Sequence, residues 1–494
     1  MRVLVWLRSD LRLHDHVLFS RAAQQDVEIL PVFIWGQRLT GTFRDGEPRM
    51  GTHRHRFLRQ SLDHLGESLA SAGAPLLVCR GDEGDILPRL LSQHRIDELW
   101  CHAEAAVEER AEEAAAERAC SDAGARFRRF WGHTLVHRDD LPFESLADLP
   151  DTFTEFRKAV ERRGLFRAPI EAPKRLRGID ASGSPLAHRE ADGDVVSAGD
   201  ERAVLPFRGG EGDGLARLWD YLWGRDLLRN YKETRNGLLG GDYSSKFSPW
   251  LAVGALSPRQ ILHEVRRYER EVVANDSTYW LVFELLWRDY FRFVALKYGS
   301  RLFKRGGLKG SPGHTAPEVP GHFDAWAAGR TGVPFVDANM RELNATGFMS
   351  NRGRQNAASY LVCDLGVDWR RGAEYFERVL LDYDPCSNWG NWAYIAGVGN
   401  DPREDRYFNV VGQARRYDTD GAYTRLWVPE LAGLRTPALH EPWAARREEL
   451  AEGRVALGRD YPRPLATPRP APPEAADAPR KHRPRGGRSS SRRA

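Results

Sequence analysis

The stretch from Leu380 to Trp392 gathers polar and indole side chains directly after an apolar helical run. It contains two carboxylates, two side-chain amides and two indoles: Asp382, Asp384, Asn388, Asn391, Trp389 and Trp392. A few carboxylates and amides in a buried pocket can bind the edge of a polar, planar heterocycle. Indoles beside such a ring lie within range for electron transfer. These residues therefore predict a buried heterocycle with redox chemistry.

Two further blocks combine guanidinium groups with amides or carboxylates. Residues 346–355 contain Asn351 and Arg354, and Glu284 and Arg288 flank Trp287 one helical turn apart. An exposed Glu–Arg pair at this spacing contributes only about 0.2–0.5 kcal/mol. These two residues lie among aromatic side chains spaced by three and four, which predict a helix over 277–297. We therefore expect them to be buried, because buried charges need partners.

A serine-rich segment lies between these blocks and the amino-terminal part of the chain. Ser248 precedes Pro249, a pair that is typical of a helix start with a hydroxyl cap. Ser244, Ser245 and Lys246 precede it, and hydroxyl groups, a lysine and a helix N-terminus can together bind phosphate. Taken alone, the segment is more often ordinary capping.

The elements that position these blocks fall into four parts. Short apolar runs at 3–7, 27–34, 76–79 and 99–101 alternate with helical patterns, which predicts a doubly wound, parallel, Rossmann-like sheet. No GxGxxG or Walker loop follows the first strand. Residues 215 onward read as all-helical, with spaced aromatic and leucine residues. We expect an α/β domain at 1–135, a linker at 136–214, a helical domain at 215–435 and a disordered basic tail at 436–494.

Composition limits the classes of protein that fit. The 494 residues include five cysteines, none in a CxxC pair, which favours a reducing, cytoplasmic setting and argues against a zinc site, an iron–sulfur cluster or a disulfide framework. No apolar run has the roughly 18 residues of a membrane span, and the start of the chain reads as a strand and not as a signal peptide. The net charge of +4 is uneven: residues 461–494 hold nine Lys/Arg and two acids, so the rest of the chain carries −3.

Three of these motifs, FELLWRDYFRF, GFMSNRGRQ and LLDYDPCSNWGNW, together resemble the flavin-binding core of the DNA photolyase/cryptochrome family, most closely its cryptochrome DASH branch. The resemblance runs from about Arg2 to Leu431. It implies an α/β domain that can carry a light-harvesting antenna, followed by an all-α FAD-binding domain. The residues that it assigns to FAD are Tyr231, Ser244, Ser245, Lys246, Phe247, Ser248, Glu284, Arg288, Phe348, Asn351, Arg354, Asp382, Asp384 and Asn388.

The resemblance also assigns roles within that set. Arg354 is expected to pair with Asp382, and Asp384 to meet the N3/O4 edge of the flavin ring. Asn388 is expected at flavin N5, where signalling cryptochromes of plants carry Asp, so an amide there favours the repair class. Trp392 and Trp369 match the first two indoles of the family's electron-hopping chain. The third indole is missing, because its position is Ala316.

A DNA lesion is the substrate that the resemblance implies. Trp287 matches the indole that stacks on a flipped-out pyrimidine pair, and Gln355 and Tyr394 replace the Met and Trp of classical photolyases in that pocket. Glu109 matches a contact to a methenyltetrahydrofolate antenna, although its Glu/Ala-rich surroundings also read as an exposed helix.

The expected activity is blue-light-driven repair of cyclobutane pyrimidine dimers, preferentially in single-stranded damaged DNA, by a monomer without a metal. The alternative is a non-catalytic blue-light receptor that signals through a partner.

Overall fold

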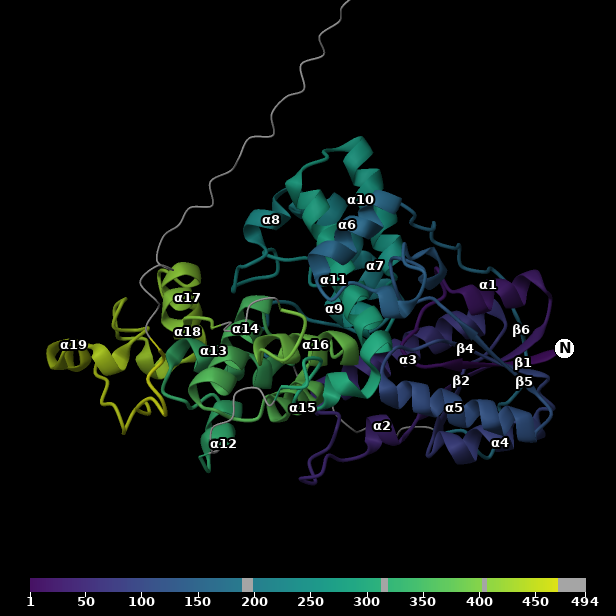
Figure 1. The fold of residues 1–494 in the computed structure, drawn as a ribbon, viewed down its shortest axis with the longest axis horizontal. Helices are drawn as coiled ribbons and strands as arrows, with labels where there is room; N and C mark the ends of the chain where they lie inside the picture. Colours follow the sequence, from purple (N-terminus) through teal and green to yellow (C-terminus); the bar gives the residue numbers. More distant parts are fainter. Residues whose placement is uncertain (189–198, 312–318, 402–406, 470–494) are drawn as a thin grey trace, which may run out of the picture.

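The structure is a computed structural model that describes residues 1–188, 199–311, 319–401 and 407–469. Two parts lie side by side, an amino-terminal α/β domain and a helical domain (Figure 1). This arrangement confirms the predicted fold class.

A parallel sheet forms the centre of the α/β domain. Its strands run in the order β3-β2-β1-β4-β5, with β6 paired to the start of β2. The strands are β1 (Arg2–Leu7), β2 (Glu28–Trp35), β3 (Leu77–Arg80), β4 (Glu98–His102), β5 (Arg126–Phe130) and β6 (Arg177–Gly178). The helices are α1 (Val17–Gln24), α2 (Gln37–Thr40), α3 (Thr52–Ala72), α4 (Glu83–Gln93) and α5 (Val107–Asp122).

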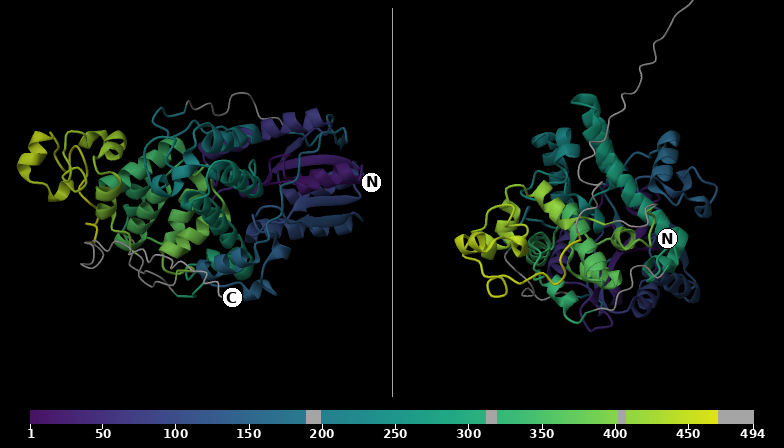
Figure 2. Two further views of the ribbon diagram at one scale, coloured as in Figure 1. Left: turned by 90° about the horizontal axis from the view of Figure 1, so that it is seen from above. Right: turned by 60° about the vertical axis from the view of Figure 1, so that its left-hand side comes forward.

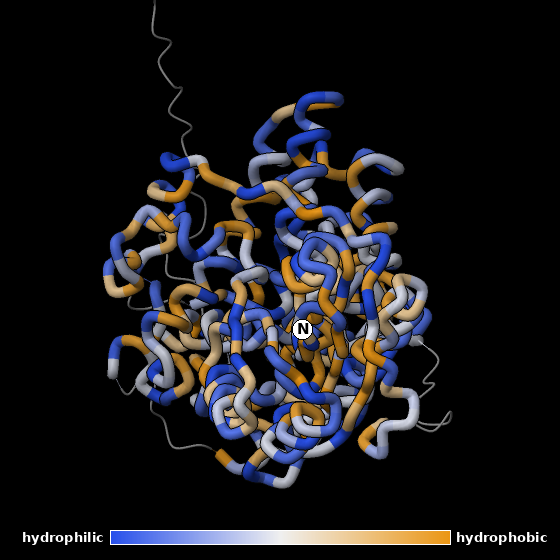
Figure 3. Tube along the Cα trace, turned by 90° about the vertical axis from the view of Figure 1, so that its right-hand side faces the viewer, coloured by the Kyte–Doolittle hydropathy of each residue, from blue (hydrophilic) through white to orange (hydrophobic). Residues whose placement is uncertain are grey.

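Alternate side chains of β1 face opposite sides of the sheet. Val3 and Val5 belong to the core that includes α1 and α3, whereas Leu4 and Trp6 belong to the core that includes α4 and α5. Figure 3 shows the resulting concentration of hydrophobic segments around the amino terminus, inside a hydrophilic surface. Because helices cover both faces of the sheet, successive residues of its strands are buried, which explains the continuous apolar runs in the sequence.

The helical domain surrounds the long helix α11. Its helices are α7 (Glu211–Trp219), α8 (Tyr231–Thr234), α9 (Ser248–Ala252), α10 (Pro258–Glu271), α11 (Asp276–Tyr298), α12 (His322–Ala327), α13 (Pro334–Thr346), α14 (Asn351–Ser359), α15 (Trp369–Val379), α16 (Pro385–Ile395), α17 (Val410–Tyr417), α18 (Ala422–Trp427) and α19 (Arg447–Glu452). Asn275 caps α11 by accepting from the backbone N–H groups of Ser277 and Thr278.

The segment 136–214, expected to be a linker, is partly folded. It contains α6 (Phe153–Arg163), which buries Phe153, Phe156 and Val160. Phe153 stacks on Trp287 of α11, with the ring centroids 3.8 Å apart. The apolar residues of α6 are spaced at one helical turn, and this period was hidden by the polar sequence around it. Residues 189–198 of the segment lie outside the described residues.

The expectation of a disordered tail from 436 was wrong for residues 436–469. This segment forms α19 and lies at the far end of the helical domain from the sheet (Figure 2). Leu439 and Tyr461 are buried in the main core, and the Tyr461 hydroxyl bonds Asp337. These few buried residues are separated by prolines and charged residues, so the sequence shows no hydrophobic period that would predict them. Residues 470–494 lie outside the described residues.

Two truncations should therefore behave differently. Ending the chain after Arg469 should leave thermal unfolding and the expected cofactor binding unchanged, while reducing the salt dependence of the expected binding to DNA, because seven Lys/Arg are removed. Ending it after Arg435 should lower the melting temperature, since each buried large apolar side chain contributes about 1.5–3 kcal/mol. Equal melting temperatures for the two forms would show that 436–469 adds nothing to the core.

Candidate functional site

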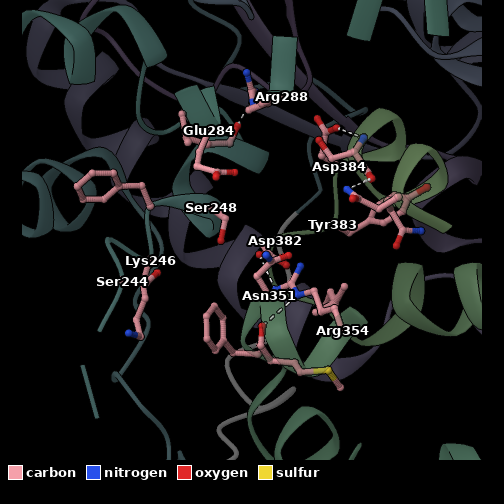
Figure 4. A pocket seen from close by; sticks show the side chains of 18 of the residues that line it. Ser244, Lys246, Ser248, Glu284, Arg288, Asn351, Arg354, Asp382, Tyr383 and Asp384 are labelled. Atoms are coloured by element: carbon pink, nitrogen blue, oxygen red, sulfur yellow. Dashed lines mark hydrogen bonds and ion pairs between the residues drawn. The ribbon is translucent and has the colours of Figure 1, made fainter. Parts of the chain in front are cut away.

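A cavity of about 300 Å³ lies between α11, α14, α16 and the loop before α9. All the residues that the resemblance assigned to FAD line it: Tyr231, Ser244, Ser245, Lys246, Phe247, Ser248, Glu284, Arg288, Phe348, Asn351, Arg354, Asp382, Asp384 and Asn388. Figure 4 shows side chains from these distant segments arranged around one space. The fold thus brings the whole predicted set together.

Arg354 and Asp382 form the expected ion pair. The Arg354 Nη2 atom lies 2.8 Å from Asp382 Oδ2, and its Nε–H donates to the Met349 carbonyl at 3.0 Å. The other carboxylate oxygen, Asp382 Oδ1, is buried and has no hydrogen-bond partner within the described parts of the chain. A buried acceptor is costly to leave unpaired. Asp382 is therefore prepared to accept a hydrogen bond from a ligand N–H.

Asp384 is held by the protein on both of its oxygens. One accepts from the backbone N–H of Ser387 at 2.8 Å and caps α16, and the other is paired with Arg292. Burial acts to raise the pKa of Asp384, but Arg292 and Arg288 hold it below its ordinary value. Sequence reasoning missed Arg292, although it lies one helical turn after Arg288 on the same face of α11.

Glu284 and Arg288 have separate partners. Glu284 pairs with Arg235, and Arg288 donates to the carbonyl groups of His133 and Leu251. Burial and the neighbouring Arg292 lower the pKa of Arg288 to about 10. Arg292 is paired with both Asp384 and Glu104, whereas Arg288 donates to backbone carbonyls and has no ion pair among the described residues. The charge of Arg288 is therefore the less compensated of the two.

The amide of Asn388 is oriented by the backbone of α15. Its Nδ2 donates to the Ala373 carbonyl at 3.0 Å, so its oxygen remains available as an acceptor. The indole of Trp392, one turn further along α16, lines the same cavity and is 2% exposed. An amide and an oxidisable ring thus lie on one face of one helix.

The serine-rich segment differs from the expected cap. α9 begins at Ser248, and the cap residue is Phe247, with no side-chain cap bond. The Ser248 hydroxyl is thus not used as the cap. Lys246 is 2% exposed, and its ammonium has no hydrogen-bond partner within the described residues. Burial, with the charge of Arg217, lowers the pKa of Lys246 to about 6.

A second cavity, of about 350 Å³, adjoins the first. Glu284, Arg288 and Asn351 line both. The three residues expected to contact a substrate, Trp287, Gln355 and Tyr394, line this second cavity together. Gln355 accepts from Arg352 at 3.0 Å, and Trp287 meets Tyr394 edge-on with the ring centroids 6.2 Å apart.

The two indoles expected in the electron path have different neighbours. Trp392 contacts Trp326 edge-on, with ring centroids 6.2 Å apart, whereas Trp369 contacts Trp389 at 5.6 Å. Ala316, where the third indole is missing, lies outside the described residues.

Glu109 lies at the interface between the two domains. It is 4% exposed and is 3.4 Å from Arg38, which excludes the reading of an exposed helix face at this position. Burial raises the pKa of Glu109 to about 7. The cavity beside it measures about 50 Å³, much less than the 300 Å³ of the cavity in the helical domain. The expected folate antenna at Glu109 stays a prediction.

Three buried side chains, Asp10, His16 and His102, are grouped closely enough to resemble metal ligands. One carboxylate oxygen of Asp10 already bonds both rings, at 3.2 Å to His16 and 2.7 Å to His102. The three side chains therefore form a hydrogen-bonded cluster.

Known protein families match both domains. Residues 3–174 match the DNA photolyase family model, and residues 280–478 match the FAD binding domain of DNA photolyase. Curated relatives include cryptochrome DASH of Synechocystis sp., which is 50% identical over 94% of this chain and 94% of the relative. Cryptochrome DASH of Xenopus laevis is 48% identical over 94% of this chain and 89% of the relative.

This chain belongs to the DNA photolyase/cryptochrome family. Solved structures agree: the Synechocystis sp. cryptochrome superposes with a TM-score of 0.90 at 48% identity, covering 94% of this chain and 96% of the other. A bacterial class III photolyase from Agrobacterium tumefaciens gives a TM-score of 0.78 at 28% identity, covering 94% of each chain. Family membership makes this chain a flavoprotein of the blue-light type, with FAD as the cofactor of its helical domain. Among the described helices, none is long and apolar enough to cross a membrane.

Proposed function

We propose that this flavoprotein repairs cyclobutane pyrimidine dimers in DNA, with a preference for single strands. One observation carries the proposal: the cavity lined by the FAD-binding residues adjoins a second cavity that presents Trp287. Glu284, Arg288 and Asn351 belong to both walls. A pyrimidine dimer that has left the base stack would thus lie beside the cofactor, across a shared polar wall.

The residues of the first cavity fit FAD. Asp382 Oδ1 has no hydrogen-bond partner among the described residues and suits a ring N–H. Lys246 Nζ also has none and suits the anionic part of the molecule, because a nearby phosphate would favour the protonated form of this amine. The guanidinium of Arg288 lines the cavity without an ion pair among the described residues, and its charge favours an electron-rich cofactor. When bound and reduced, FAD supplies the electron that blue light releases. The role of the protein is then to position and orient FAD and the lesion and to exclude water.

The residues of the second cavity suit two covalently linked pyrimidines. The indole of Trp287 stacks on Phe153 and lines the cavity. Gln355, held by Arg352, offers an amide that can bond a base edge. An amide and a phenol, in place of the Met and Trp of the classical pocket, reduce its apolar and stacking surface. Extracting a dimer from a duplex costs a few kcal/mol that a single strand avoids.

The proposal has a direct binding test in Trp287→Ala. The variant should bind a dimer-containing single strand about 1–3 kcal/mol more weakly, roughly 5- to 150-fold, because one base–aromatic stack is lost. Flavin content should be retained, since Trp287 does not line the first cavity. Binding is measured by fluorescence anisotropy on strands with and without the dimer.

The matched control is Trp280→Ala, on the same face of α11 but outside both cavities. It should leave the preference for the dimer intact. Equal affinity of Trp287→Ala and the parent chain for the dimer would exclude this cavity as the lesion site. The receptor alternative predicts no dimer preference in either protein.

A further inference from the structure

We propose that Tyr375 is the surface end of the electron path that starts at Trp392, with Trp326 as the buried intermediate. The proposal rests on the proposed function, which needs reduced FAD, and concerns how light can bring FAD to that state. It names the residue that replaces the missing indole at Ala316.

Ring contacts connect the flavin cavity to Tyr375 without a gap. Trp392 lines the cavity and meets Trp326 with centroids 6.2 Å apart. Trp326 meets Tyr375 with centroids 5.6 Å apart, again edge-on. Phe376 contacts both indoles, at 5.1 Å from Trp392 and 6.1 Å from Trp326, and fills the space between them. Trp392, Trp326 and Tyr375, all oxidisable, therefore form a continuous row in which each ring contacts the next.

The path needs a surface end because Trp326 is completely buried. Tyr375 is half-buried and lines a cavity of about 530 Å³ at the outer side of α12 and α15, together with Phe323 and Arg371. Its hydroxyl donates to Asn344 Oδ1 at 2.5 Å and lies 3.1 Å from the Ala327 carbonyl. Tyr375 is thus the ring of this succession that a small solute can approach.

The path through Trp369 leads elsewhere. Trp369 contacts Trp389, whose other ring neighbour is Phe303. The two indoles are 4% and 7% exposed, and a phenyl ring is a poor electron donor. Within the described residues, this branch reaches no tyrosine or tryptophan beyond Trp389.

The electron balance is simple. Bound oxidised FAD would, when excited by light, accept one electron from Trp392; Trp326 would then give one to the Trp392 cation, and Tyr375 one to the Trp326 cation. The O–H bond of Tyr375 then breaks, and its proton passes to water in the outer cavity. A thiol returns one electron and one proton to the tyrosyl radical, and two of the resulting thiyl radicals combine as a disulfide. Repeated light absorption can therefore continue as long as thiol is present.

The test is the radical formed under blue light in flavin-loaded protein, freeze-trapped and measured by electron paramagnetic resonance. The parent chain should give a tyrosyl signal that dithiothreitol removes. Tyr375→Phe and Trp326→Phe should lose it, while Trp369→Phe should keep it. The control is Tyr279→Phe, which removes another partly exposed tyrosine that contacts Phe283, away from both indoles. Flavin absorbance of each variant reports correct folding.

The outcomes separate this inference from the proposed function. A tyrosyl signal that survives Tyr375→Phe, or that requires Trp369, would overturn the assignment of Tyr375. A parent chain that gives only a tryptophan radical would overturn it as well, while light-driven flavin reduction stood. If the parent chain binds flavin but forms no protein radical under light, the protein does not reduce its flavin through these rings at all. Repair by chemically pre-reduced protein should be unchanged in Tyr375→Phe.

Discussion

Replacing Trp392 with phenylalanine is expected to abolish light-driven flavin reduction by external donors. The indole lines the large cavity and contacts Trp326. An electron that passes from Trp326 to the cofactor therefore has to cross this ring. Phenylalanine keeps an aromatic ring in the packed core but cannot be oxidised at a comparable potential. Repair by chemically pre-reduced protein should be retained, because the proposed lesion cavity is lined by Trp287 and not by Trp392. Flavin bleaching under blue light and dimer loss are the two measurements.

Trp389→Phe is the matched control for this variant. It removes a neighbouring indole of the same helix that does not line the cofactor cavity. We expect flavin reduction to be retained. If Trp392→Phe bleaches as fast as the parent chain, electrons enter the cofactor by another route. If both variants lose reduction and repair together, the losses reflect disturbed packing.

Arg354→Met is expected to remove flavin binding and to destabilise the fold. The substitution keeps most of the side-chain volume but leaves the Asp382 carboxylate, which is 3% exposed, without its partner. Removing one member of a fully buried ion pair costs about 3–5 kcal/mol, and a smaller loss is expected here because the Arg354 side chain is 26% exposed. Denaturant unfolding measures the loss of stability, and flavin absorbance after gel filtration measures the loss of the cofactor.

The double variant Arg354→Met with Asp382→Asn separates these two effects. With no charge left buried, much of the stability should return, but flavin binding should not, because the ring loses both polar contacts. Arg354→Lys should be intermediate, since it keeps the charge and loses the donation from Nε to Met349. Flavin affinity unchanged in Arg354→Met would show that this pair is not part of the cofactor site.

The apolar runs of β1 to β4 were sufficient to predict the class of the amino-terminal domain. The residues that line the large cavity were named through the family resemblance of motifs such as Asp382 to Asn388, and the fold brings them together. β5 was missed because three of its five residues are arginine. It is an edge strand, where charged side chains are expected to prevent further pairing.

What the sequence could not predict are contacts between distant segments. Asp384 is held by Arg292, and Arg292 in turn contacts Glu104 of the α/β domain at 3.3 Å. Glu109 reads as part of an exposed helix because its neighbours are Glu and Ala, yet the second domain covers it. The order of residues 436–469 likewise depends on contacts such as Tyr461 with Asp337, far apart in the chain.

Light-dependent loss of cyclobutane dimers from a single-stranded oligonucleotide tests the central claim most directly. The protein is loaded with FAD, chemically reduced and mixed with dimer-containing strands, and one half is kept in the dark. We expect dimers to disappear under blue light and to remain in the dark, with slower loss from the same sequence in a duplex. Persistence of the dimers in illuminated single strands, with reduced flavin demonstrably bound, would contradict the repair function.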